Sequence, residues 1–96
     1  RALLLSAFTL EQEAAMLLLN RTDAEPTRSV LFRSAATLAL KCGLPDEAYK
    51  LTIKGLDGNV PVEFQNELLD ILELIKFERH LQFQGIKLSN DEVQVS

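Results

Sequence analysis

Residues 27–58 of this chain read TRSVLFRSAATLALKCGLPDEAYKLTIKGLDG, and this stretch decides the fold. Apolar side chains recur at helical spacing on both sides of Gly43, which Leu44 and Pro45 follow directly. Glycine favours the left-handed conformation that ends a helix, and proline is favoured in the first turn of the next helix. Because the connection is so short, the two helices should pack antiparallel. The stretch therefore predicts a helical hairpin.

The first helix of the hairpin is expected to begin at Thr27 or Ser29, either of which could cap it, and to end at Cys42. Its apolar stripe consists of Leu31, Ala35, Leu38 and Cys42. A second stripe repeats every four residues and should face solvent; it consists of Arg33, Thr37 and Lys41. The helix is thus predicted to bury one face and to present a partly basic one.

The second helix is expected from Pro45 to Leu56, ahead of the turn at Asp57-Gly58. Its first turn carries Asp46 and Glu47, and their negative charge suits a helix N-terminus. The residues predicted to form its buried face follow the i, i+3, i+4, i+7, i+8 pattern: Ala48, Leu51, Thr52, Gly55 and Leu56.

A third helix is expected over residues 61–81, with Asn59 as its cap. Its main stripe consists of Phe64, Leu68, Ile71, Leu72 and Ile75. Three further apolar residues fall off that stripe: Leu74, Phe77 and Leu81. An apolar arc this wide indicates a helix between two layers or a helix with a contact surface.

The two ends of the chain are read from weaker patterns. Residues 9–12 resemble a capping box for a helix that ends near Asn20, and residues 2–8 either extend that helix upstream or form a separate one. Apolar residues alternate over 81–83, 86–88 and 93–95. This alternation favours a β hairpin or the first strands of a following domain, although a loose tail is the alternative. We therefore expect an all-α helical array over residues 1–81 and a short β-like tail over residues 82–96.

Composition narrows the class of protein. The 96 residues are 47% hydrophobic and 25% charged, which is typical of one globular domain. The net charge of −4 argues against a nucleic-acid interface, which requires a basic surface. No apolar run approaches the roughly 20 residues that span a bilayer, and the lone Cys42 gives no sign of an oxidising compartment. We expect a cytoplasmic protein, and we interpret the start at Arg1 as the start of a piece of a longer polypeptide.

Residues 27–58 resemble a tetratricopeptide repeat, a helical hairpin of about 34 residues with small side chains where its helices meet. The residues that carry the resemblance are Phe32, Ala35, Ala36, Ala39, Gly43, Ala48, Thr52 and Gly55. Phe32 stands where tryptophan is usual, Ala39 and Thr52 stand where large aromatic residues are usual, and the closing proline, Pro61, comes one residue late. The resemblance implies a concave surface, lined by the first helix of each hairpin, that binds peptides of partner proteins. Where such repeats clamp a carboxylate, a basic residue precedes an asparagine by one turn; here Arg33 precedes Thr37, so no clamp is implied.

Candidate chemical groups are few. His80 is the only histidine, and Cys42 falls on an apolar stripe, so we expect a surface imidazole and a buried thiol rather than a catalytic pair. The carboxylates Glu63, Glu67, Asp70 and Glu73 lack the Glu-x-x-His pattern of metal-binding bundles and indicate a solvated face. No P-loop, dinucleotide-binding, zinc-protease or Cys-x-x-Cys motif is present. The chain is predicted not to be an enzyme and to use no cofactor, metal ion or small-molecule substrate.

The basic residues are concentrated in Arg21, Arg28, Arg33 and Lys41. A helix-turn-helix that reads DNA is disfavoured, because Asp46 and Glu47 would approach the phosphates, whereas an acidic peptide suits the same cations. The function we expect is a non-catalytic protein–protein interaction or scaffolding module. The residues predicted to bind the partner are Arg33, Thr37, Lys41, Leu74, Phe77 and Leu81. The alternative is a structural or dimerisation domain that packs through residues 61–81.

Overall fold

The computed structural model of the chain describes residues 2–83, with side chains through residue 81. Four helices follow one another: α1 (Ala2–Leu17), α2 (Thr27–Lys41), α3 (Pro45–Leu56) and α4 (Val62–Phe83), with one turn of 3-10 helix, η1 (Thr22–Ala24), between α1 and α2. The predicted all-α class is confirmed for this part of the chain. The strands predicted over residues 86–88 and 93–95 lie outside the described residues.

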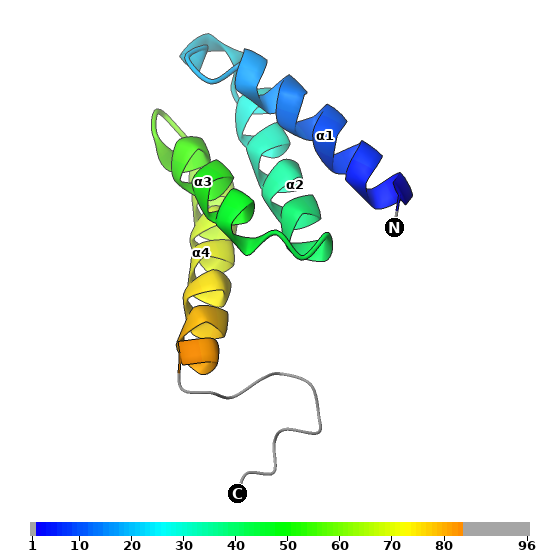
Figure 1. Cartoon of the computed structure of the whole chain (residues 1–96). Coiled ribbons are helices and arrows are strands. Elements are labelled where there is room, and N and C mark those ends of the chain that lie inside the picture. The colour runs from blue at the N-terminus through cyan, green and yellow to red at the C-terminus, as the bar shows by residue number, and fades with distance from the viewer. Residues whose placement is uncertain (1, 84–96) are drawn as a thin grey trace, which may run out of the picture.

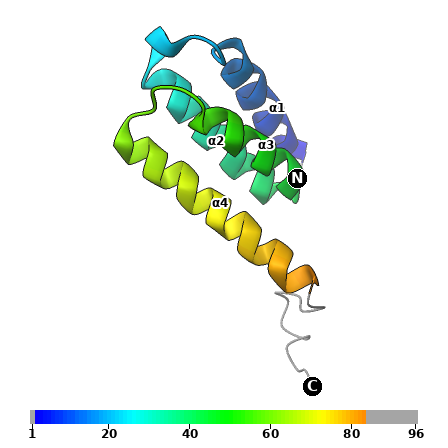
Figure 2. The same ribbon diagram turned by 90° about the vertical axis from the view of Figure 1, so that its left-hand side faces the viewer.

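The four helices form an up-and-down array (Figure 1). The central helix is α2, which packs most extensively against α3 and α1 and also contacts α4. In Figure 1 and Figure 2, α1 and α4 lie at opposite ends of the array, with the α2–α3 hairpin between them. The α2 helix therefore has α1 on one side and α4 on the other.

Small residues let α2 and α3 approach closely. The fully buried alanines are Ala35, Ala36 and Ala39 on α2 and Ala48 on α3. Gly55 of α3 lies directly against Phe32 of α2: a Cβ atom added at Gly55 would be 2.8 Å from the Phe32 Cβ, a distance that real Cβ atoms do not show. The predicted hairpin and its close helix contact are therefore present.

The turn of the hairpin follows the predicted chemistry. Gly43 adopts a φ of 74°, the left-handed conformation in which glycine ends a helix. Its N–H donates to the Leu40 carbonyl at 3.0 Å, and the Leu44 N–H donates to the Ala39 carbonyl at 2.9 Å. These bonds satisfy two of the carbonyls that the end of a helix leaves without a partner. Pro45 then opens α3.

The N-terminal helix differs from the sequence prediction. Thr9 lies inside α1, where its Oγ1 donates to the Leu5 carbonyl at 2.9 Å, so the predicted capping box at residues 9–12 is wrong. Of the two alternatives for residues 2–8, the upstream extension holds. Leucine and alanine, both strong helix formers, dominate that segment, and Phe8 and Ala15 are buried two turns apart on one face.

The start of α2 also differs. The cap position is Pro26, which has no side-chain hydrogen bond to the helix, so neither Thr27 nor Ser29 is the cap. Instead the Glu25 carboxylate accepts from the Ser29 N–H at 3.0 Å and from the Ser29 Oγ at 2.7 Å. A carboxylate upstream of the helix thus satisfies an amide of its first turn, and its charge suits the helix N-terminus.

The longest helix, α4, starts and ends later than predicted. It begins at Val62, and amides of its first turn donate to the Pro61 carbonyl, so Asn59 is not its cap. It continues through Phe83, which makes residues 81–83 helical rather than the start of a strand. Three alternating residues are too few to distinguish the two-residue period of a strand from the 3.6-residue period of a helix. Leu81 lies seven residues after Leu74, a spacing that keeps both on one face of a helix.

A buried arginine joins three segments of the array. The Arg28 side chain is 1% exposed and reaches the ends of both α1 and α3. It donates to the carbonyls of Leu19 at 3.0 Å, Lys54 at 2.8 Å, Gly55 at 3.1 Å and Asp57 at 2.7 Å, and lies 3.4 Å from the Glu25 carboxylate. Backbone carbonyls beyond a helix end have no amide partner within the helix. The guanidinium therefore takes the role of a cap for two helices at once.

Candidate functional site

A hollow of about 600 Å³ lies between α1 and α2. Its lining consists of Ala7, Leu10 and Glu11 from α1 and Arg33, Ser34, Thr37, Leu38 and Lys41 from α2. The three residues predicted on the solvated stripe of α2 thus line one hollow together with two leucines. Figure 1 shows α1 running roughly antiparallel to α2. The hollow between them combines the apolar side chains of Ala7, Leu10 and Leu38 with polar and charged groups of both helices.

Arg33 stands at the border between this hollow and α4. Its Nη1 donates to the Glu67 carboxylate at 2.6 Å, and its guanidinium lies 5.3 Å from the centre of the Phe64 ring. The side chain of Arg33 remains 33% exposed and that of Glu67 49% exposed. The ion pair fixes the direction of the guanidinium and leaves most of its five N–H groups for another acceptor.

The remaining cations of the predicted basic concentration differ in their environment. Arg28 is buried against backbone carbonyls and cannot reach a ligand at the surface, so its assignment to an exposed basic concentration is wrong. Arg21 forms two hydrogen bonds with Asp23, at 3.0 and 3.1 Å. These hydrogen bonds are the main cause that lowers the pKa of Asp23 and raises the pKa of Arg21. Lys41 is exposed and takes part in no ion pair within the described part of the chain.

The second predicted set of residues lies on α4. Leu74 is 45% exposed and Phe77 is 54% exposed, whereas Leu81 is half-buried. The three share one face of α4, since they are spaced three and four residues apart. These residues lie away from the buried α4 residues Leu68 and Ile75. The structure does not join the two predicted sets in one hollow, because only residues of α1 and α2 line the α1–α2 hollow.

A second groove, which the sequence did not indicate, lies between α1 and α3. Its volume is about 590 Å³, and it is lined by Gln12, Glu13, Met16, Leu17, Glu47, Lys50, Leu51 and Lys54. The apolar part comes from the α1 residues Met16, 40% exposed, and Leu17, 81% exposed. The helical period alone could not indicate this groove, because it does not show which residues of α3 approach α1.

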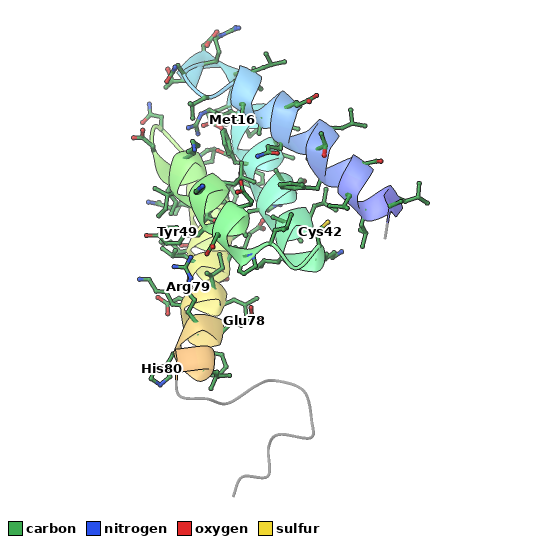
Figure 3. All side chains as sticks on the ribbon, viewed as in Figure 1. Met16, Cys42, Tyr49, Glu78, Arg79 and His80 are labelled. Atoms are coloured by element: carbon green, nitrogen blue, oxygen red, sulfur yellow. The ribbon has the colours of Figure 1, made fainter. Side chains whose placement is uncertain are left out.

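The reactive side chains do not converge. Cys42 is 6% exposed at the end of α2, and His80 is exposed near the end of α4. Figure 3 shows the two on well-separated parts of the molecule, with Tyr49 and Arg79 on the side of α4 that also carries His80. There Arg79 donates to Asp46 at 2.8 Å and lies 4.8 Å from the Tyr49 ring centre, which ties α4 to α3. Cys42 and His80 are therefore not a nucleophile and its base.

No group of three or more histidine, cysteine, aspartate or glutamate side chains in residues 2–81 has the arrangement of a metal site. None of the helices described here combines the length and the apolar character needed to cross a bilayer. Comparisons with known protein families, with characterised proteins and with solved structures found no match to this chain.

Proposed function

We propose that this chain is a non-catalytic protein–protein interaction module that binds an acidic, partly apolar segment of a partner protein in the α1–α2 hollow. One observation supports the proposal above the others: Arg33, Thr37 and Lys41 line a single hollow together with Leu10 and Leu38. Peptide and ligand sites commonly combine an apolar lining with a few polar groups that set orientation.

The charges of the hollow favour an acidic segment. Lys41 is exposed at one end, and Arg33 keeps free donors beside its ion pair with Glu67 at the other. Four positions along a helix rise about 6 Å, so the two cations stand about 12 Å apart along α2. In an extended segment, two acidic residues four positions apart lie about 13 Å apart on one face and would span that separation. The apolar residue midway between them shares that face and would lie against Leu10 and Leu38. Glu11 lies on the α1 side and would disfavour a basic segment.

We also propose that α2 and α3 are a degenerate tetratricopeptide-like hairpin. The close contact of Gly55 with Phe32 and the buried Ala36 and Ala48 support this assignment. The Arg33–Glu67 pair joins α2 to α4, the two helices that would line a concave surface in such an array. A peptide-binding role follows from that resemblance independently of the charges in the hollow.

Selection from a displayed library of random peptides tests the binding proposal. We expect the retained peptides to be enriched in aspartate or glutamate next to leucine or isoleucine. Lys41→Glu should weaken their binding at least tenfold, whereas the matched Lys50→Glu, on α3 and outside the hollow, should retain it. An absence of enrichment, or equal losses in both variants, would contradict the proposal. A loss in Lys50→Glu alone would place binding in the α1–α3 groove instead.

A structural role for α4 is the second candidate, favoured by the exposure of Leu74 and Phe77 on one face. In this role α4 would pack against a neighbouring domain or a second copy of the chain. The double variant Leu74→Gln/Phe77→Gln should then abolish that association in sedimentation equilibrium. Leu69→Gln, a change of an equally exposed leucine on another side of α4, is the control. Association that survives the double variant would exclude α4 as the contact.

A further inference from the structure

Two cations line the α1–α2 hollow, and their surroundings differ. The Lys41 ammonium takes part in no ion pair within the described residues. The Arg33 guanidinium is engaged twice by α4: its Nη1 donates to the Glu67 carboxylate at 2.6 Å, and the group lies 5.3 Å from the centre of the Phe64 ring. One cation of the hollow therefore already has an acidic partner inside the chain.

The position of Glu67 makes this partner a competitor of any acidic ligand. Arg33 lines the hollow, whereas Phe64 and Glu67 belong to α4 and lie outside its lining. A hydrogen bond between charged groups is among the stronger ones, and the aromatic ring attracts the same guanidinium. Both contacts hold the guanidinium toward α4. A ligand in the hollow thus meets an arginine whose charge is already partly neutralised.

We infer that Glu67 is an internal competitor that restricts the hollow by occupying Arg33. This inference rests on the proposed binding of an acidic segment in the α1–α2 hollow. A carboxylate of the partner reaches Arg33 either beside the Glu67 carboxylate or after Glu67 has released Nη1. The first arrangement places two like charges against one guanidinium, and the second breaks an ion pair. In both cases part of the binding free energy is lost.

The exposure of the pair keeps this restriction reversible. The side chain of Arg33 is 33% exposed and that of Glu67 is 49% exposed, so water screens their attraction. Two unit charges about 4 Å apart in water change an equilibrium constant by about fivefold. We therefore expect Glu67 to weaken the binding of an acidic segment by about three- to fivefold and not to block it.

The two ends of the hollow should consequently contribute unequally to binding. At Lys41 a carboxylate of the partner gains a new ion pair. At Arg33 it shares or replaces an ion pair that the free chain already has. Lys41→Gln should accordingly cost more affinity for an acidic segment than Arg33→Gln, and equal costs would contradict the neutralisation of Arg33 by Glu67.

Calorimetric titration with a capped peptide tests the competition. The peptide carries a leucine with a glutamate two positions before it and another two positions after it. We expect Glu67→Gln to bind this peptide about three- to fivefold more tightly than the unmodified chain does. Glu73→Gln is the matched control, because Glu73 is also exposed on α4, forms no ion pair within the described residues and changes the net charge equally. Equal affinities of the two variants would overturn the inference.

Two further variants show where the gain arises. The double variant Arg33→Gln/Glu67→Gln should bind no more tightly than Arg33→Gln alone, because the competition acts through Arg33. A gain that persists without Arg33 would indicate a general effect of net charge and would overturn the inference.

Lys41→Glu separates this inference from the proposed function. If the unmodified chain binds the peptide and Lys41→Glu lowers its affinity, the hollow is the binding site, and a missing gain in Glu67→Gln then refutes the competition alone. If neither the unmodified chain nor Glu67→Gln binds the peptide, the proposed function fails, and the competition that rests on it fails as well.

Discussion

Replacing Arg28 by methionine should destabilise the fold more than any other exchange of a charged residue. The side chain is 1% exposed, and its guanidinium donates to four backbone carbonyls at the ends of α1 and α3. It also lies 3.4 Å from the Glu25 carboxylate, whose side chain is 12% exposed. Methionine keeps part of the aliphatic stem and removes every donor. The four carbonyls would then lose this donor, and the Glu25 carboxylate would lose the opposite charge and keep only its hydrogen bonds from Ser29.

The magnitude follows from these contacts. Removing one member of a buried ion pair typically costs about 3–5 kcal/mol, because the other charge stays buried and unpaired. Hydrogen bonds from a charged donor contribute about 1.5–3 kcal/mol each, but bonds made by one group are not additive. We therefore expect a loss of about 3–5 kcal/mol for Arg28→Met. A domain of this size has a total stability of about 4–12 kcal/mol, so the variant should be partly or largely unfolded at room temperature.

Urea unfolding followed by far-ultraviolet circular dichroism measures the loss. Arg33→Met is the matched control, because its pair with Glu67 is solvent-exposed and should contribute at most about 1 kcal/mol. The double variant Glu25→Gln/Arg28→Met should recover the part of the loss that comes from the unpaired carboxylate. If Arg28→Met lies within about 1 kcal/mol of the unmodified chain, or loses no more than Arg33→Met, the proposed role of Arg28 is refuted.

Other substitutions probe the packing and the charges. Gly55→Ala should cost about 1–3 kcal/mol in urea unfolding, because its Cβ would lie 2.8 Å from the Phe32 Cβ. Ala36→Leu should cost a similar amount, since Ala36 is fully buried, and an unchanged midpoint in both would contradict the close α2–α3 contact. In an NMR titration the Asp23 carboxylate should show a pKa below its ordinary value, which rises in Arg21→Gln. Because the pKa of Asp23 is lower in the folded than in the unfolded chain, the small stabilisation by this pair is present above the unfolded pKa and is lost as the pH falls through the folded pKa. An equal pKa of Asp23 in the unmodified chain and in Arg21→Gln would contradict the assignment.

The hairpin could be predicted because its signals are local. Gly43 and Pro45 fix the turn within three residues, and the small residues of α2 and α3 mark where the helices meet. Arg28 could not be predicted in this way. The carbonyls it binds in α3 lie 26–29 positions further along the chain, and no spacing in the sequence marks a backbone carbonyl as unsatisfied. An arginine in a basic concentration was therefore interpreted as exposed.

Part of the candidate site could also be predicted, because the helical period is a local signal. The stripe of Arg33, Thr37 and Lys41 follows from the helical period alone, and the structure places all three in one hollow. The other wall could not be predicted, because the helical period shows which residues share a face of α1 but not that Leu10 lies beside α2.

The most direct test of the binding proposal is an NMR titration of the full chain with two short capped peptides. In one peptide leucine has a glutamate two positions before it and another two positions after it, and in the other peptide lysine replaces each glutamate. We predict that the acidic peptide shifts the backbone amides of residues 7–11 and 33–41, the two walls of the α1–α2 hollow, and that the basic peptide does not. Equal shifts with both peptides, or shifts confined to other helices, would contradict the proposal that this hollow binds an acidic segment.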